Sequence, residues 1–365
     1  MNNNFAAIVV SAGYSSRMHD FKPLLQFGER PALTNIIRVL KTSGVKDIVV
    51  VIGHRGDELK NKIQETGIRY VYNENYPQGM YSSVVKGVKE IDGEAPAFFL
   101  WPVDIPLIKE ETIRLLMKEF KEKNKGIIHP TFDGKRGHPP LIHSKYIKAI
   151  TEGDGAGGLK RILEQYEDDA LDLPLWDEAI LMDMDTKEDY NNLLEYFHRE
   201  APSRQECLEI LKFYKLPENI IRHSLKVSEI SLKLLESLGD KGDHIDKNIL
   251  EAAALLHDIA RLEKNHDKKG ARMVERLGYS KLAGPISTHI DISVDRNEKI
   301  TEAELLYLAD KLVKEDQLMP LDVRLGEQKK AYMDKPMVLA KIEERYQMAG
   351  RIMDKIKKAN GDITI

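Results

Sequence analysis

The first half of the chain alternates short, unbroken apolar runs with helical stretches, and this alternation is its strongest constraint on fold. Apolar runs of strand length occupy residues 5–10, 47–52, 68–72 and 97–103, and a helical pattern covers 33–43. Strands that are apolar throughout are typical of a parallel sheet covered by helices on both faces. We therefore expect a doubly wound, mostly parallel, Rossmann-like α/β domain whose ligands bind at the carboxyl ends of the strands.

The pattern changes near residue 198, where a polar segment containing Pro202 precedes a long region of helical periodicity. Apolar residues then recur at spacings of three and four over residues 220–234, 249–262, 271–277, 301–313 and 337–356. The second half is therefore predicted to be an all-α helical bundle. A chain of 365 residues divides naturally into two domains, which we place at 1–198 and 199–365.

Charge and cysteine content narrow the possible functions. The formal net charge of −4 gives no electrostatic reason to expect nucleic acid or an anionic membrane as a partner. No run approaches the roughly 20 apolar residues of a membrane span, and the N-terminus does not resemble a signal peptide. The single cysteine, Cys207, excludes an intramolecular disulfide and zinc sites built on cysteine pairs, and is interpreted as a buried apolar residue. We expect a cytoplasmic protein and leave its oligomeric state open.

A loop of small residues follows the first apolar run and offers a phosphate site. Its sequence runs from Ser11 to Met18, and Lys22 follows shortly after. The backbone N–H groups of such a loop can approach a polyphosphate, whose charge Arg17 and Lys22 can neutralise. The loop matches neither the P-loop nor the dinucleotide-binding glycine pattern. On these residues alone, a solvated turn is about as good an explanation.

These residues resemble the opening motif of the molybdenum cofactor nucleotidyltransferase family, and the similarity extends over residues 5 to about 196. The matching features are Ala12-Gly13-x-Ser15-x-Arg17-Met18, Lys22, Gly53, the segment 73–83 with Gly79, Ser82 and Ser83, Asp104, Gly137-His138-Pro139, Gly153-Asp154-Gly155 and the segment 182–189. Three positions depart from the family pattern, since Ser11, His19 and Lys187 replace the usual alanine, glycine and proline.

The resemblance implies transfer of a nucleoside monophosphate from an NTP to a small phosphorylated acceptor, a pterin phosphate, with release of pyrophosphate. The Ala-Gly opening resembles the cytidylyl branch more than the guanylyl branch, which favours CTP. Arg17 and Lys22 are then catalytic, and the expected substrate contacts are Ala12, Gly13, Ser15, Gly53, Gly79, Ser82, Ser83 and His138. For Ser82 and Ser83, contact with the base or ribose and capping of a helix remain equally good interpretations.

Asp104 follows the apolar run 97–103, so its carboxylate is expected at the carboxyl end of a buried strand. Mg²⁺ binds carboxylates together with phosphate oxygens, and it would stabilise charge on the α-phosphate and on the leaving pyrophosphate. We therefore predict Asp104 as a catalytic magnesium ligand, with structural capping as the alternative. Asp185, or Asp183 beside it, could supply a second carboxylate, although an acidic run before a helix is often an N-cap.

In the second half, histidines and aspartates occupy helical stripes that are otherwise apolar. His223, His257, His266 and Asp310 each align with apolar or small residues at helical spacing, so their side chains should point into one interior. A buried carboxylate needs a partner, and a bound metal would satisfy all of these groups together. One such histidine alone would more often be a satisfied core residue.

This set resembles the HD phosphohydrolase superfamily over residues 205–325. The resemblance implies that His223, His257, Asp258 and Asp310 hold one metal, that His266 and His289 hold a second, and that the catalytic Asp258 bridges the two. Imidazole and carboxylate ligands suit Mn²⁺, Fe²⁺ or Mg²⁺. Lys311, Arg261 and Arg324 could bind substrate phosphate, although each is more often a solvated surface charge.

The leading hypothesis is a bifunctional enzyme that transfers a nucleotidyl group and hydrolyses a phosphate ester or nucleotide. A sugar phosphate or polyol phosphate could replace the pterin as acceptor. Alternatively, the first domain could only sense a nucleotide, or the second could be a metal-free scaffold. The helical tail from Glu327 lies outside both resemblances, and its role stays open.

Overall fold

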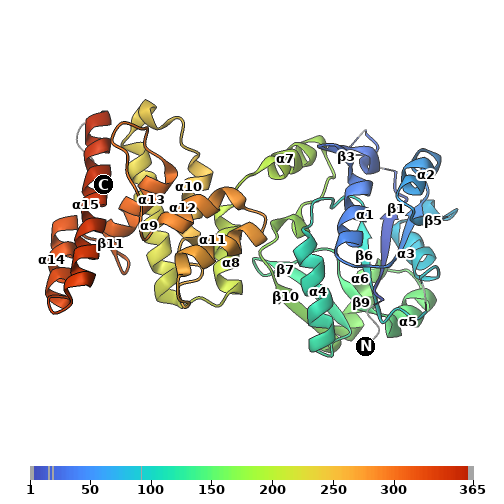
Figure 1. Cartoon of the computed structure of the whole chain (residues 1–365). Coiled ribbons are helices and arrows are strands. Elements are labelled where there is room, and N and C mark those ends of the chain that lie inside the picture. The colour runs from blue at the N-terminus through green and yellow to red at the C-terminus, as the bar shows by residue number, and fades with distance from the viewer. Residues whose placement is uncertain (1–3, 15–16, 19, 92, 361–365) are drawn as a thin grey trace. The chain divides into compact units, whose positions relative to one another are not determined.

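The structure is a computed structural model that describes residues 4–14, 17–18, 20–91 and 93–360. Contacts between Cα atoms divide it into two compact units, Met1–His198 and Arg199–Ile365, and each unit has its own core (Figure 1). None of the described helices is both long enough and apolar enough to cross a membrane.

The first unit contains a mixed, mostly parallel sheet with the strand order β10-β7-β9-β6-β1-β4-β5. Its parallel strands include β1, β4, β5 and β6, whereas β9 runs antiparallel to β6 and β7, and β8 pairs antiparallel with β7. The strands are β1 (Ala6–Ser11), β4 (Asp47–Ile52), β5 (Arg69–Tyr72), β6 (Ala97–Pro102), β7 (Ile127–Phe132), β8 (Lys135–Arg136), β9 (Leu141–His143) and β10 (Ala170–Pro174). A separate hairpin joins β2 (Gln26–Phe27) to β3 (Arg30–Pro31).

Helices cover both faces of this sheet, which explains why its central strands are apolar throughout. One face packs against α1 (Ala32–Thr42), α2 (Gly56–Glu65) and α4 (Glu110–Glu122). The other packs against α3 (Met80–Val88), α5 (Ile147–Glu152) and α6 (Gly158–Leu163), and α7 (Lys187–His198) adds a smaller core. The predicted doubly wound α/β class is confirmed, with the antiparallel β9 as the departure from a fully parallel sheet.

The second unit is helical, as predicted, except for one short hairpin. Its helices are α8 (Arg204–Phe213), α9 (Glu218–Glu236), α10 (Lys247–Leu256), α11 (His266–Arg276), α12 (Ala283–Thr288), α13 (Glu302–Leu312), α14 (Leu321–Ala331) and α15 (Pro336–Asn360). The hairpin pairs β11 (Val313–Lys314) with β12 (Gln317–Leu318) directly after α13.

One predicted helix ends earlier than expected. Periodicity predicted a helix over residues 249–262, but α10 ends at Leu256 and the chain continues through turns. The ring of His257 donates from Nδ1 to the carbonyl of Ala254, 2.8 Å away, one turn back in the helix. His257 and Asp258 therefore lie at a helix end, where the chain can turn both side chains toward the same interior.

Candidate active sites

The loop after β1 and the end of β6 enclose a cavity of about 270 Å³ in the first unit. Ser11, Ala12 and Gly13 line one side, and Lys22 and Asp104 line another. The parallel pairing of β1 with β6 brings these segments together, because both strands end at the same edge of the sheet. This is where the sequence placed a ligand site.

Lys22 forms the centre of a charge cluster beside this cavity. Its side chain is buried, and Nζ lies 2.6 Å from Oδ1 of Asp185 and 3.8 Å from Oδ2 of Asp104. Arg17 reaches the same Asp185 from the solvent side, with 2.8 Å between the guanidinium and Oδ2. The structure thus gathers Arg17, Lys22, Asp104 and Asp185 around one point.

The environments of the carboxylates differ. Burial raises the pKa of Asp104, and the nearby Asp185 adds to this rise while Lys22 opposes it. The hydrogen bond from Lys22 holds the pKa of Asp185 below its usual range. Burial and the charges of Asp185 and Asp104 raise the pKa of the adjacent Asp183. Such crowding of carboxylates favours a bound cation, so the donor set fits Mg²⁺.

Asp185 does not cap α7, which was the alternative role that its sequence position allowed. The amide and hydroxyl of Thr186 donate to Oδ2 of Asp189 at 2.7 and 2.8 Å, and the amide of Asp189 donates back to Thr186 at 3.2 Å. Thr186 and Asp189 therefore cap α7, which leaves Asp185 to pair with Lys22 and Arg17.

Ser82 and Ser83 also do not act as N-caps. The N-cap of α3 is Gly79, which lies in the cavity wall with φ of 102°, a conformation that favours glycine. The side-chain amide of Asn73 donates to both serine hydroxyls at 2.9 Å. Of the two serines, Ser83 lines the cavity, whereas Ser82 does not and donates instead to backbone carbonyls.

Two further residues predicted to contact substrate need comment. Gly53 does not line the cavity but lies behind its wall, where an added Cβ would stand 2.9 Å from Ala12 and from Tyr76. Close packing that holds the loop therefore explains its position, and a direct contact of Gly53 with substrate stays a prediction. Ser15 lies outside the described residues.

His138 lines a different, larger cavity of about 570 Å³. This second cavity shares Met80 and Pro102 with the first, so the two are neighbours. Burial lowers the pKa of His138, and burial lowers that of His129 in the same wall to about 4. Both rings are therefore neutral at physiological pH, and Nδ1 of His138 is buried with no hydrogen-bond partner among the described residues.

Sequence reasoning missed several residues of the first cavity. The buried hydroxyl of Ser11 lines it and has no hydrogen-bond partner within the described part of the chain. Tyr14 and Tyr76 also line it, with ring centroids 5.3 Å apart, and Tyr14 is 52% exposed. Tyr14 is an exposed aromatic residue in the loop after β1, and this feature of the sequence could have indicated a surface on which a base can stack.

In the second unit, His223, His257 and His289 share one ring orientation. Nδ1 of each ring contacts a backbone carbonyl, and Nε2 faces the interior of the cluster. Nδ1 of His223 lies 2.8 Å from the carbonyl of Glu315, that of His257 2.8 Å from Ala254, and that of His289 2.7 Å from Ile286. A backbone carbonyl can only accept, so each Nδ1 carries a proton, and each Nε2 is the ring atom that faces the carboxylates and could bind a metal. This is the usual arrangement of histidines that bind a metal through Nε2.

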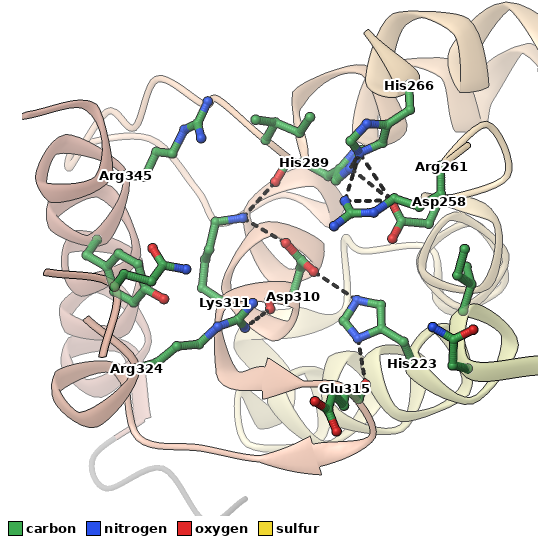
Figure 2. A pocket seen from close by; sticks show the side chains of 15 residues that line it. His223, Asp258, Arg261, His266, His289, Asp310, Lys311, Glu315, Arg324 and Arg345 are labelled. Carbon is green, nitrogen blue, oxygen red and sulfur yellow. Dashed lines mark hydrogen bonds and ion pairs between the residues drawn. The ribbon is translucent and has the colours of Figure 1, made fainter. Parts of the chain in front are cut away.

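Asp258 lies between these rings. Its Oδ2 is 3.5 Å from Nε2 of His257, and its Oδ1 is 3.3 Å from Nε2 of His266 and 3.5 Å from Nε2 of His289. Two sets of three candidate ligand atoms therefore share Asp258, one with His223 and His257 and one with His266 and His289, each within 4.8 Å. Figure 2 shows His223, Asp258, His266 and His289 converging on one cavity. The volume of this cavity is about 450 Å³.

Asp310 completes the cluster. Its Oδ1 is 3.1 Å from Nε2 of His223 and 3.7 Å from Nε2 of His257, and Lys311 holds its Oδ2 at 2.7 Å. Burial opposes its ionisation, but Lys311 and the two histidines keep the pKa of Asp310 well below its usual range. All six predicted ligands thus lie together, contributed by α9, the segment after α10, α11, the end of α12 and α13.

His257 gives a further reason to expect a cation here. Its side chain is buried, burial lowers its pKa to about 4, and its Nε2 has no hydrogen-bond partner among the described residues. An unsatisfied buried polar atom costs about 1–3 kcal/mol, which a metal bound at Nε2 would remove. The imidazole and carboxylate donors fit Mn²⁺ or Fe²⁺.

The three predicted phosphate-binding cations all line this cavity. Lys311 is buried and also donates to the carbonyl of His289 at 3.1 Å, while Arg261 donates to Nε2 of His266 at 3.1 Å. Arg324 donates to the carbonyl of Asp310 at 2.5 Å. Beyond these, the wall contains Gln328, Arg345 and Tyr346, which sequence reasoning missed because they lie outside the recognised motifs.

The folds and sites define a two-domain protein with a nucleotidyltransferase-type α/β unit and a helical unit of the metal-dependent phosphohydrolase type. Comparison with known families agrees. Residues 7–170 match the MobA-like NTP transferase domain and residues 220–314 match the HD domain, so the chain combines these two domains, and the predicted resemblances are confirmed.

Curated relatives match the first half of the chain. It is 28% identical to the molybdenum cofactor cytidylyltransferase of Escherichia coli K12 over 185 residues, which are 50% of this chain and 92% of that protein. It is 34% identical to the bifunctional protein GlmU of Clostridioides difficile over 164 residues, or 44% of this chain, and it spans only 33% of that relative's length. The crystal structure of Rv0371c from Mycobacterium tuberculosis H37Rv superposes with a TM-score of 0.47 at 19% identity, covering 53% of this chain and 98% of that one.

Proposed function

We propose that the first unit transfers a nucleotidyl group from an NTP, with CTP as the favoured donor, to a molybdopterin-like phosphorylated acceptor. The observation that carries this proposal is the cluster of Lys22, Asp104 and Asp185 beside a cavity that adjoins a second, larger cavity. Two neighbouring cavities suit a reaction that joins two substrates. Similarity to a cytidylyltransferase over most of that protein's length supports the choice of CTP.

In this reaction, an oxygen of the acceptor phosphate attacks the α-phosphorus of the NTP. The bond from that phosphorus to the bridging oxygen breaks, and pyrophosphate leaves with the electron pair. Lys22 and Arg17 would neutralise the triphosphate, and Asp104 and Asp185 would hold Mg²⁺. The ion would supply positive charge where the transition state accumulates negative charge.

The larger cavity is proposed to hold the acceptor. Its wall includes Tyr81, Leu100 and Leu159 together with the neutral rings of His129 and His138. Apolar surfaces with a few hydrogen-bonding edges suit a flat heterocycle such as a pterin. Similarity to GlmU proteins keeps a sugar phosphate or polyol phosphate as the second candidate acceptor.

Pyrophosphate release, measured for each of the four NTPs with a molybdopterin-type acceptor and with sugar phosphates, tests the transferase. We expect release only with a molybdopterin-type acceptor and fastest with CTP. Release with a sugar phosphate but not with a molybdopterin-type acceptor would identify the sugar phosphate as the acceptor. If no combination releases pyrophosphate while nucleotides still bind, the unit is a sensor. Because NTPs are cytoplasmic metabolites, we propose a cytoplasmic location.

We propose that the second unit hydrolyses a phosphate ester or nucleotide. His223, His257, Asp258 and Asp310 would hold one divalent ion, and His266, His289 and the shared Asp258 a second. Ions there would polarise a water molecule and the phosphoryl oxygens. The oxygen of water forms a bond to phosphorus, the ester P–O bond breaks, and the leaving oxygen takes up a proton. Lys311 and Arg261 would orient the phosphoryl group.

Stoichiometric metal analysis combined with phosphate release tests this second activity. We expect one or two Mn²⁺ or Fe²⁺ ions per chain and hydrolysis that chelation abolishes. Protein that retains no metal after reconstitution would instead be a scaffold, and the hydrolase proposal would fail.

A further inference from the structure

The cavity over the six candidate metal ligands is not enclosed by the HD domain alone. The matched family region ends at residue 314, yet Arg324, Gln328, Arg345 and Tyr346 also line the cavity. The first two lie on α14 and the last two on α15, which together we name the tail hairpin (Leu321–Asn360). In Figure 2, Arg324 and Arg345 approach Lys311 and Asp310 from the side opposite His223 and His266.

The tail hairpin is anchored firmly beside α13, the helix that carries Asp310. Lys355 on α15 contacts both carboxylate oxygens of Glu304 at 2.8 and 2.9 Å, and both side chains are buried. The hydroxyl of Tyr307 donates to the carbonyl of Arg345 at 3.0 Å. Buried apolar residues of α15 add to this packing, among them Ala349, Ile352 and Ile356. The hairpin is therefore a fixed wall of the cavity.

Arg324 links this wall to the candidate metal ligands. Its guanidinium donates to the carbonyls of Asp310 and Val313, at the C-terminal end of α13. The carbonyl of Asp310 also accepts the backbone N–H of Val313, and a cation at this helix end interacts favourably with the helix dipole. Arg324 thereby holds Asp310 in place and brings positive charge to the cavity.

Tyr346 is the observation that points to a ligand. Its side chain is only 6% exposed, yet its hydroxyl has no hydrogen-bond partner among the described residues and the residue lines the cavity. Leaving such a hydroxyl unsatisfied costs about 1–3 kcal/mol, which an acceptor atom on a bound molecule would offset. Burial raises the pKa of Tyr346, so the hydroxyl keeps its proton and can donate.

The charge of the wall indicates what kind of molecule binds. Arg261, Lys311, Arg324 and Arg345 all line the cavity, and Arg345 is partly neutralised by Asp291, with contacts of 2.6 and 2.9 Å. The cavity volume of about 450 Å³ falls within the usual range for small-molecule sites. A nucleotide with more than one phosphate fits this charge and size better than a small ester of single charge.

We propose that the tail hairpin is the specificity wall of the phosphohydrolase site. In this proposal, which rests on the proposed hydrolase function, Tyr346 and Gln328 form hydrogen bonds with the non-reacting part of a nucleoside polyphosphate. Arg324 and Arg345 attract its further phosphate groups. The hairpin lies outside the HD family region, so the specificity belongs to this chain and not to the HD domain in general.

The test compares ADP with p-nitrophenyl phosphate, which has one phosphate group and no nucleoside, as substrates of the Mn²⁺-loaded full-length chain. Every protein carries Asp104→Ala, so that the transferase site contributes no turnover. We expect Tyr346→Phe to raise KM for ADP about 5- to 10-fold, the worth of one hydrogen bond, and to leave KM for p-nitrophenyl phosphate unchanged. The matched control is Tyr332→Phe, since Tyr332 is on the same hairpin but does not line the cavity.

Metal content and thermal midpoint separate recognition from structure. Because the hydroxyl of Tyr346 lacks a partner among the described residues, Tyr346→Phe should keep both metal content and thermal midpoint at their original values. Equal kinetic constants in Tyr346→Phe and its parent, or the same change for both substrates, would overturn the specificity wall while leaving the hydrolase intact. If the parent protein turned over neither substrate, the proposed hydrolase activity would be overturned, and the proposed specificity wall would be overturned with it.

Discussion

Lys22 and Asp185, 163 residues apart in the chain, form the tightest ion pair of the candidate transferase site, with 2.6 Å between Nζ and Oδ1. The lysine is buried and its second neighbour is Asp104. The pair connects the segment that follows the loop after β1 with the segment before α7. Both ends of the transferase domain therefore contribute to one charge cluster.

Replacing Lys22 by alanine should lower nucleotidyl transfer about 10²- to 10³-fold, as expected for losing one group that stabilises developing charge. The measurement is pyrophosphate release with CTP and a molybdopterin-type acceptor. Lys187→Ala is the matched control, because Lys187 is exposed and close in sequence to Asp185. Normal rates in a folded Lys22→Ala protein would exclude this lysine from the reaction.

Replacing His257 by alanine should abolish phosphate release while sparing transfer. Even residues behind a metal ligand change affinity or activity about 10- to 100-fold, so loss of a ligand should exceed this. Metal content per chain should fall in parallel, and added Mn²⁺ should no longer raise the thermal midpoint of the helical unit. His198→Ala, at an exposed histidine that lines none of the three cavities, serves as control. Loss of both activities in a folded variant would contradict the independence of the two domains.

The transferase unit should become less stable as the pH falls from about 6.5 to about 4. Burial lowers the pKa of His129 from 6.5 to about 4, so in this window the unfolded chain binds a proton that the folded one does not. The stabilisation is fully present above pH 6.5 and falls by at most about 3 kcal/mol toward pH 4. Urea unfolding of wild type and His129→Gln checks this, and an equally steep pH dependence in the variant would refute it.

Replacing Gly53 by alanine should weaken nucleotide binding although Gly53 does not line the cavity. The new Cβ would stand 2.9 Å from the Cβ and the carbonyl oxygen of Ala12, so the phosphate loop must shift. We expect a loss of about 1–3 kcal/mol in stability, typical of overpacking, together with a higher KM for the NTP. Gly93→Ala is the control, since nothing lies within 4 Å of its added Cβ. A wild-type KM in Gly53→Ala would contradict the supporting role.

Much of the fold could be predicted from local pattern. The apolar runs at residues 5–10, 47–52 and 97–103 became β1, β4 and β6 within a residue or so, because burial on both faces leaves a signal in every position of a strand. The long helices of the second unit were likewise visible as periodic stripes. Apolar periodicity does not show where a polar side chain ends a helix. Helix α10 accordingly stops at Leu256, before the end predicted at residue 262.

The identity of the candidate ligands was also readable in the chain. Helical spacing selects His223, His257, His266 and Asp310, and the resemblance to the HD superfamily adds Asp258 and His289. The tertiary structure decided which side chains lie in contact with one another. Asp185 is available to Lys22 because Thr186 and Asp189 cap α7, and Gly53 supports the loop because Ala12 packs against it. Tyr346 faces the candidate metal centre because α15 packs beside α13, a contact between segments far apart in sequence. Sequence alone determined the elements and the chemistry they carry, because burial and periodicity act locally. The partners of each side chain depend on long-range packing, which only the folded chain defines.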